Sequence, residues 1–303
     1  MYFFIFFAMI ITGAVMTKLS KLFQNTFKKR KTNKSVKIGV AFGGGGTKAF
    51  AHLGAIKAFE EYGIKFDFVS GTSAGSLIGA FYAAGLSYEQ IYELGKNLKV
   101  SDFKPNKVFF IPSKTDGVEK LVEKNIPYEN IEDLPIPYAS CAVDLYTTKE
   151  VTISKGSIAK AVAASCALPG FYTPVEYKDM LLADGGLHNT IPATIPKHFG
   201  CDYVVGIDVN PTRGQGAKSA KVVDVLTCSL GILLKNNTRK GYENSDVMVQ
   251  IKTGKYKFTK LDGYEEMIEE GYRATIDKMD EILELFGKKN IKENRPDKGV
   301  LVV

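Results

Sequence analysis

The chain has 303 residues, of which 45% are hydrophobic, and this composition excludes a disordered protein because it supplies enough apolar side chains for a core. Its formal charge of +7 comes from 40 basic and 33 acidic residues. Seven of the basic residues lie within the first 34 positions, which contain no acid, so the remainder holds 33 of each sign. The net charge therefore gives no indication of a nucleic-acid-binding domain, and we expect no nucleic-acid partner.

Residues 1–34 begin with the uncharged stretch MYFFIFFAMIITGAVM and continue as a basic arm. This stretch is shorter than the roughly 20 apolar residues of a bilayer span, and it lacks the positive start of a secretory signal. Three interpretations remain open: a short membrane anchor, a processed leader, or upstream sequence if Met16 starts the chain. From Met16 onward, apolar residues at helical spacing among lysines would still suit an interfacial helix. We expect the arm to hold residues 35–303, a single domain, at an anionic, cytoplasm-facing membrane surface.

A short β-type run, KIGVAF, leads into four glycines, Gly43 to Gly46, and then into a helical pattern that Gly63 can stop. A P-loop is excluded because Gly46 is followed by Thr47 and Lys48 and not by Lys-Ser/Thr. A dinucleotide loop is disfavoured because the acid at the required offset, Asp67, begins its strand and does not end it. Successive glycine N–H groups also suit an oxyanion hole, which we favour.

The next strand, FDFVS, passes directly into Gly-Thr-Ser-Ala-Gly at residues 71–75. In such a turn the serine lies at a sharp bend between strand and helix, and Gly71 and Gly75 let the bend close. The following residues predict a helix whose N-terminus begins beside Ser73, where its N–H groups and dipole favour negative charge. The order strand, glycine loop, helix, strand, helix predicts a parallel sheet with a site at the carboxyl ends of its strands.

Further along, LLADGGLHNTIP places Asp184 at the end of an apolar run and before two glycines, which predicts a carboxylate exposed on a turn. An Asx-type turn alone is the alternative. A strand is expected over DYVVGIDVN, with Asp208 capping a turn, and helices are expected over residues 219–240 and 264–286. The four cysteines, Cys141, Cys166, Cys201 and Cys228, are far apart and form no metal motif with the three histidines. A reduced protein without a metal is the simplest interpretation.

Four ordered blocks resemble those of the patatin-like phospholipase family of bacterial type: GGGGTKAFAHLG, GTSAG, ASCALPGFYTPV and DGGLHNTIP, within residues 37–209. The resemblance implies an α/β protein with a three-layer α/β/α fold and a mainly parallel central sheet. It also implies a lipolytic serine acyl hydrolase, of phospholipase A or lysophospholipase type, that acts on membrane lipid esters without metal or organic cofactor. The oligomeric state does not follow from it.

By position, the resemblance makes Ser73 the nucleophile and Asp184 the general base of a Ser-Asp dyad. Backbone N–H groups would form the oxyanion hole, and further residues would support the motifs. The oxyanion donors are Gly44, Gly45, Gly46 and Ala74, and the supporting residues are Gly43, Lys48, Gly71, Gly75, Gly185 and Gly186. The chain departs from the family at Ala49, where glycine is common; this small change leaves the oxyanion hole in place.

Two alternatives stay open. A Ser-His-Asp esterase of α/β-hydrolase type would use His188 after an acid, but that fold has several strands before its nucleophile turn, and the sequence leaves room for only two before Ser73. A non-catalytic lipid-binding regulator could share the fold, although it would have no need of both Ser73 and Asp184.

Overall fold

The structure is a computed structural model that describes residues 36–97, 113–211, 216–217, 219–256 and 263–287. The described residues all belong to one compact unit, Val36–Val303, and the N-terminal arm lies outside them. In the described part of the chain, no helix combines the length and the apolar character that crossing a bilayer requires.

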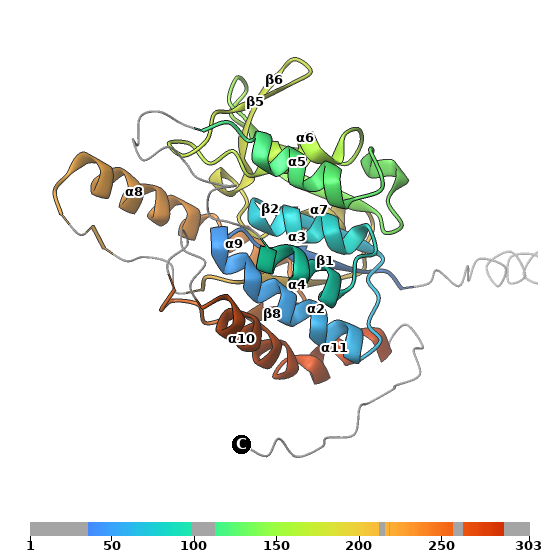
Figure 1. The fold of residues 1–303 in the computed structure, drawn as a ribbon. Coiled ribbons are helices and arrows are strands. Elements are labelled where there is room, and N and C mark those ends of the chain that lie inside the picture. Colours follow the sequence, from blue (N-terminus) through green and yellow to red (C-terminus); the bar gives the residue numbers. More distant parts are fainter. Residues whose placement is uncertain (1–35, 98–112, 212–215, 218, 257–262, 288–303) are drawn as a thin grey trace, which may run out of the picture. The chain divides into compact units, whose positions relative to one another are not determined.

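A single sheet forms the centre of the molecule (Figure 1). Its strands are β1 Ile38–Phe42, β2 Phe68–Thr72, β3 Tyr138–Asp144, β4 Lys149–Ile153, β5 Val175–Tyr177, β6 Met180–Asp184, β7 Tyr203–Asp208 and β8 Val247–Gln250. They follow the order β5-β6-β3-β2-β1-β7-β8, and β4 pairs with β3 outside this path. The five strands β3, β2, β1, β7 and β8 are parallel, whereas β4, β5 and β6 pair antiparallel. The sheet is therefore mainly parallel, as the sequence predicts.

Strand β3 brings the ends of β2 and β6 together. Its pairs with β2 end at Thr72↔Cys141, and its pairs with β6 begin at Ala142↔Asp184. Strand β4 pairs with β3 along both of these regions. Because a strand has only two edges, β4 must occupy one of them, so β2 and β6 share the other and meet end to end. The backbone therefore has to leave the sheet at the end of β2 and at the end of β6.

Helices cover both faces of the sheet, which gives three layers (Figure 1). The α-helices are α2 Ala51–Glu61, α3 Ala74–Ala83, α4 Tyr88–Asn97, α5 Asp116–Asn125, α6 Ile158–Ser165, α7 Thr194–His198, α8 Val222–Asn236, α9 Arg239–Asn244, α10 Tyr264–Ile276 and α11 Met279–Gly287. The described residues also form the short 3-10 turns η1 Gly46–Phe50, η3 Ile131–Asp133 and η4 Gly185–Leu187.

Side-chain alternation along the buried strands divides the core into two. From β1, Ile38, Val40 and Phe42 enter a large core that α2, α3, α5, α6, α10 and α11 complete. Ala41 points the other way, into a smaller core built with α7. All five residues of β1 are buried, as expected of a strand covered on both faces.

Two predicted helices are each divided in the structure. The expected helix over residues 219–240 is α8 followed by α9, with the break at Asn237 and Thr238. The expected helix over residues 264–286 is α10 followed by α11, with the break at Asp277 and Lys278. Between α10 and α11 the apolar periodicity continues through Ile276, Met279 and Ile282, so the pattern could not locate that break. The break between α8 and α9 lies in residues 235–240, which are all polar, and the sequence did carry a signal for it.

Candidate active site

Ser73 occupies a strained turn between β2 and α3. Its φ is 55° and its ψ is −133°, a conformation that a residue with a side chain adopts at a cost of about 1–3 kcal/mol. The Ser73 N–H donates to Ser165 Oγ at 2.8 Å, and Ser165 Oγ donates in turn to the Cys141 carbonyl at 2.6 Å. These bonds fix the turn against β3. Ser73 itself is half-buried, so its hydroxyl retains access to solvent.

The two glycines around Ser73 are required by close backbone contacts. A Cβ on Gly71 would lie 2.5 Å from the Ser76 Cα, and a Cβ on Gly75 would lie 2.3 Å from the Phe42 carbonyl oxygen. Both distances are too short for any side chain. Helix α3 therefore starts directly against the carboxyl end of β1, which carries the glycine loop.

The glycine loop lies beside Ser73. A Cβ on Gly44 would lie 3.2 Å from the Ser73 Cβ. The loop is held by its own backbone, since the Gly43 N–H donates to the Ile207 carbonyl at 3.0 Å and the Gly44 N–H donates to the Thr190 carbonyl at 2.9 Å. The Gly44 N–H is thus used inside the protein, and the expectation that it binds an oxyanion is corrected.

The other expected oxyanion donors differ from Gly44 in their hydrogen bonding. Among the hydrogen bonds of the described residues, none uses the N–H groups of Gly45, Gly46 or Ala74. Gly45 precedes η1, and Ala74 begins α3, so both are groups that a helix N-terminus leaves unpaired. These N–H groups remain candidates for the oxyanion hole.

Asp184 ends β6 and is buried, with 2% of its surface exposed. The predicted exposed carboxylate is therefore wrong: α6 and the segment after it cover the turn, and the Asp184 N–H donates to the Ala167 carbonyl at 3.0 Å. Asp184 Oδ1 accepts from the Gly186 N–H at 2.8 Å, which is the Asx-type bond that the sequence left as an alternative. A buried carboxylate in a turn near Ser73 is a stronger candidate for chemistry than an exposed one.

The Asp184 turn and the Ser73 turn are both supported by the same residue of β3. A Cβ on Gly185 would lie 2.3 Å from the Cys141 carbonyl oxygen, the oxygen that accepts from Ser165. The strand partners of Thr72 and Asp184 are Cys141 and Ala142, which are consecutive in β3. One step along a strand is about 3.3 Å. The strand ends that precede Ser73 and carry Asp184 consequently lie next to each other.

None of the three histidines is arranged as a triad base among the described residues. His52 is fully buried, burial lowers its pKa to about 4, and its Nε2 bonds the Gly43 carbonyl at 2.8 Å. His198 ends α7. The neighbouring Phe199 stacks at 4.7 Å on Phe68, which begins β2, so His198 lies near the amino end of β2 and not near the carboxyl end that leads to Ser73. His188 follows the Asp184 turn, yet no hydrogen bond between described residues joins its imidazole to a carboxylate.

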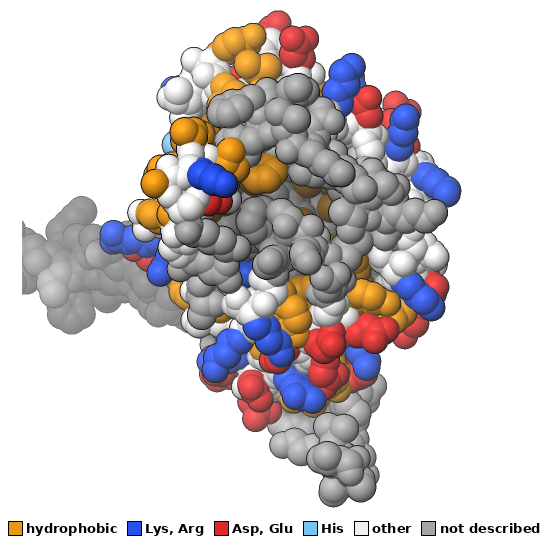
Figure 2. Space-filling model, turned by 60° about the vertical axis from the view of Figure 1, so that its left-hand side comes forward, with side chains coloured by type: hydrophobic (Ala, Val, Ile, Leu, Met, Phe, Trp, Pro, Cys, Tyr) orange, Lys and Arg blue, Asp and Glu red, His pale blue; other side chains and the backbone are white. Residues whose placement is uncertain are grey.

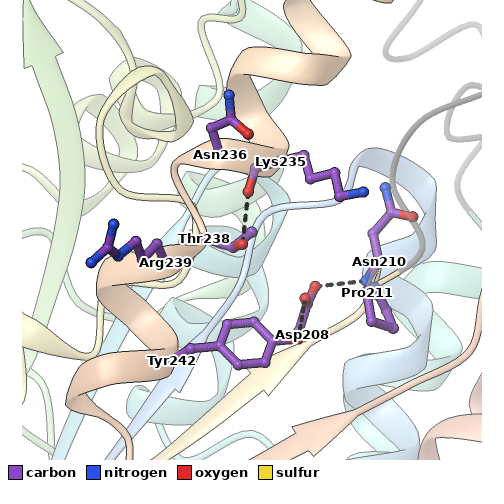
Figure 3. Close-up of a pocket in the computed structure, with 8 residues that line it drawn as sticks. All are labelled: Asp208, Asn210, Pro211, Lys235, Asn236, Thr238, Arg239 and Tyr242. Atoms are coloured by element: carbon purple, nitrogen blue, oxygen red, sulfur yellow. Dashed lines mark hydrogen bonds between the residues drawn. The ribbon is translucent and has the colours of Figure 1, made fainter.

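Lys48 connects the glycine loop to the end of β7. The side chain is buried, and its Nζ donates to Asn210 Oδ1 at 2.9 Å. Asn210 lines a pocket of about 520 Å³ with Asp208, Lys235, Arg239 and other residues (Figure 3). Asp208 accepts from the Asn210 N–H at 2.8 Å and from the Tyr242 hydroxyl at 3.0 Å, which agrees with a turn-capping role.

Sequence reasoning missed three supporting residues of this site. Ser165 lies within a quoted block, but its bond to Ser73 depends on how α6 packs, which no local pattern reveals. His52 and Asn210 act on the glycine loop through tertiary contacts only. In the described part of the chain, no group of three His, Cys, Asp or Glu residues is arranged to hold a metal.

A model of the patatin-like phospholipase family matches residues 40–197, slightly more than half of the chain. The chain belongs to this family. The match begins within β1, contains Ser73 and Asp184, and ends in α7. The patatin-like fold accounts for the three layers and for a site at the carboxyl ends of β1 and β2.

Two relatives and one solved structure agree with the family. An uncharacterized NTE family protein of Mycobacterium tuberculosis is 29% identical over 190 residues, which cover 62% of this chain and 53% of that protein. Patatin-like phospholipase domain-containing protein 6 of Homo sapiens is 34% identical over 182 residues, which cover 57% of this chain and 13% of that protein. The chain thus spans about half of the first relative and a small part of the second. VipD from Legionella pneumophila, with a TM-score of 0.52 at 15% identity over 82% of this chain and 67% of that chain, shares the fold.

Proposed function

We propose that this patatin-like protein is a lipolytic serine acyl hydrolase that cleaves acyl esters of phospholipids or lysophospholipids. The observation that carries the proposal is the meeting of the strained Ser73 turn with the buried Asp184 at one edge of β3. A strained, half-exposed serine next to a buried carboxylate is costly to maintain for structure alone. Family membership points to the same chemistry.

In the proposed mechanism, Ser73 Oγ attacks the acyl carbonyl while Asp184 accepts its proton. The oxyanion that forms would accept hydrogen bonds from the N–H groups of Gly45, Gly46 and Ala74, near the positive end of α3. One such donor is commonly worth about 3 kcal/mol of transition-state stabilisation. The leaving alcohol takes the proton from Asp184, and water then hydrolyses the acyl-serine with Asp184 again as the base.

A fluorophosphonate probe tests the nucleophile, because it phosphonylates an activated serine and no other hydroxyl at a comparable rate. We expect the probe to label the wild type, to leave Ser73→Ala unlabelled, and to label a control, Ser229→Ala, at an exposed position of α8, like the wild type. Release of free fatty acid from diacyl phospholipid and from lysophospholipid would then separate the two substrate types. Equal labelling of Ser73→Ala, or no labelling of the folded wild type, would favour the non-catalytic lipid-binding regulator.

A further inference from the structure

Helix α8 carries an unusual concentration of exposed apolar side chains. Nine large hydrophobic residues are exposed in the described part of the chain, and six of them lie on this helix. They are Val222, Val223, Val225, Leu226, Ile232 and Leu233. Single exposed hydrophobic residues are ordinary, but a group of this size on one element marks an interaction surface.

Most of these residues form one stripe. The spacing of Val222, Val225, Leu226, Ile232 and Leu233 follows the three-and-four pattern of a single helix face. Val222 is 62% exposed and Leu233 is 55% exposed, so the stripe is open at both ends of the helix. In Figure 1, α8 extends to the left of the molecule, and Figure 2 turns that side forward. Hydrophobic side chains are visible on this side in Figure 2. We call these five residues the α8 stripe.

The charges around the stripe indicate whether a bilayer or a second copy of the chain binds to it. Lys221 precedes the helix and Lys235 lies in its last turn, and neither forms an ion pair with another described residue. The acid on α8, Asp224, accepts a hydrogen bond from the Ser219 hydroxyl. Lysines at both ends of an apolar stripe suit a bilayer, in which the stripe enters the acyl region and the lysines reach lipid phosphates. Antiparallel packing of α8 on a second copy would instead bring Lys221 close to Lys235 of the other chain, which is unfavourable.

The C-terminal end of α8 rests on the catalytic turn. A Cβ on Gly186 would lie 2.8 Å from Leu234 Cδ2, and the Leu234 carbonyl accepts from the Thr190 hydroxyl at 2.8 Å. Just beyond the helix, Asn237 Nδ2 donates to the Leu187 carbonyl at 2.7 Å and the Gly186 carbonyl at 3.1 Å. A surface bound by α8 therefore lies next to the turn that carries Asp184.

From these observations we propose that the α8 stripe docks the protein on a lipid bilayer and presents the lipid esters of that bilayer to the site beside Asp184. The inference rests on the proposed function where it treats the lipid esters as substrates of the site. The docking itself does not require turnover. Zwitterionic bilayers engage the stripe alone, whereas anionic bilayers also engage Lys221 and Lys235.

The first test compares vesicle binding of full-length chains that carry Ser73→Ala, so that no lipid is consumed. Val222→Gln, Leu226→Gln and Leu233→Gln together replace three of the five stripe residues, at both ends and in the middle, and keep good helix formers. The matched control replaces exposed apolar residues elsewhere: Leu145→Gln, Tyr146→Gln and Phe199→Gln. With anionic vesicles, we expect the stripe variant to bind roughly tenfold more weakly and the control to bind like the parent. Equal binding by both variants, together with no emission shift at position 226 in the second test, would overturn the proposal.

The second test reads out α8 directly, because the N-terminal arm could hold all variants on vesicles. An environment-sensitive fluorophore is attached at Leu226→Cys, or at Phe199→Cys as the control, in full-length chains that also carry Cys228→Ser. Vesicles of phosphatidylcholine with phosphatidylglycerol should shift the emission of the label at position 226 to the blue and leave the label at position 199 unchanged. No shift at position 226 in the presence of vesicles would overturn the proposal. A shift that appears without vesicles and grows with protein concentration would also overturn it, and would indicate a surface for self-association.

Activity separates this inference from the proposed function. In chains with Ser73 intact, the stripe variant should lose roughly tenfold on vesicle phospholipid and stay within about twofold on a soluble short-chain ester. If the wild type hydrolyses neither substrate yet shows the blue shift at position 226, the proposed function fails and the docking surface stands. A stripe variant that loses both activities equally while remaining folded would count against docking.

Discussion

At the residue scale, Asp184 carries the sharpest mechanistic prediction. Asp184→Asn keeps the shape of the side chain and can still accept from the Gly186 N–H, but it cannot take a proton from Ser73. We expect kcat on a soluble ester to fall by about two to four orders of magnitude with KM little changed. His188→Ala, a residue on the same turn, should retain activity within a few fold.

The opposite pattern would contradict the dyad. If His188→Ala abolished turnover in a folded protein and Asp184→Asn did not, a histidine would be the base, and the α/β-hydrolase-like alternative would gain. Circular dichroism of both variants excludes a loss of fold as the reason.

His52 predicts how stability depends on pH. The pKa of the folded state is about 4, lowered by burial from the usual 6.5, so the unfolded chain binds the proton first as the pH falls. This group therefore contributes stability above pH 6.5 and loses it between about pH 6.5 and pH 4, a change of roughly 3 kcal/mol for the full shift. Its Nδ1 is buried and has no hydrogen-bond partner among the described residues, which agrees with a neutral ring.

Urea unfolding at about pH 7 and about pH 4.5 measures this contribution. His52→Asn keeps an amide donor for the Gly43 carbonyl and removes the titration. We expect the loss of unfolding free energy between the two pH values to be smaller in the variant by roughly 2–3 kcal/mol. An unchanged pH dependence would show that His52 titrates alike in the folded and unfolded states.

At the element scale, the sequence predicted those strands, helices and turns that depend on residues close together in the chain. The strand before the glycines, the helix that Gly63 ends with φ +64°, and the serine turn all depend on residues close in sequence, and each is found as β1, α2 and the junction of β2 with α3. The break between α10 and α11 could not be read, because buried positions continue across it: Ile268 and Met279 are both core residues on different helices. The break between α8 and α9 falls in the polar run of residues 235–240, which the prediction of a single helix overlooked.

The candidate site shows the same division between local and tertiary information. The positions of Ser73 and Asp184 followed from motifs, whereas the burial of Asp184 follows from the packing of α6 on β6. The engagement of the Gly44 N–H follows from Thr190, a residue 146 positions later in the chain. Which glycine N–H groups are available could be known only once β1, β7 and the Asp184 turn were placed together.

At the scale of the whole molecule, two surfaces are proposed to bind the membrane: the α8 stripe and the N-terminal arm of residues 1–34. The arm is an inference from sequence and lies outside the described residues. If it contributes, a chain that begins at Ser35 should sediment less with anionic vesicles than the full chain, since each basic residue near an anionic leaflet adds about 1 kcal/mol, attenuated by salt.

Neutral vesicles and raised salt provide the controls for the arm. The difference between the two chains should shrink in both, because charge supplies most of the contribution of the arm if Met16 is the start. A difference that survives on neutral vesicles would point to insertion of the apolar residues before Met16. Equal sedimentation of the two chains under all conditions would remove the arm as an anchor.

The backbone conformation of Ser73 lowers the stability of the fold, and the same residue is the proposed nucleophile. At φ 55° glycine would be the residue of least strain, so the protein is less stable with its serine than the same backbone would be without it. Selection for heat resistance alone would favour replacing the residue that we propose as the nucleophile. A screen for thermostable variants of this chain consequently has to demand turnover at every round, because the easiest gains in melting temperature lie where catalysis is lost.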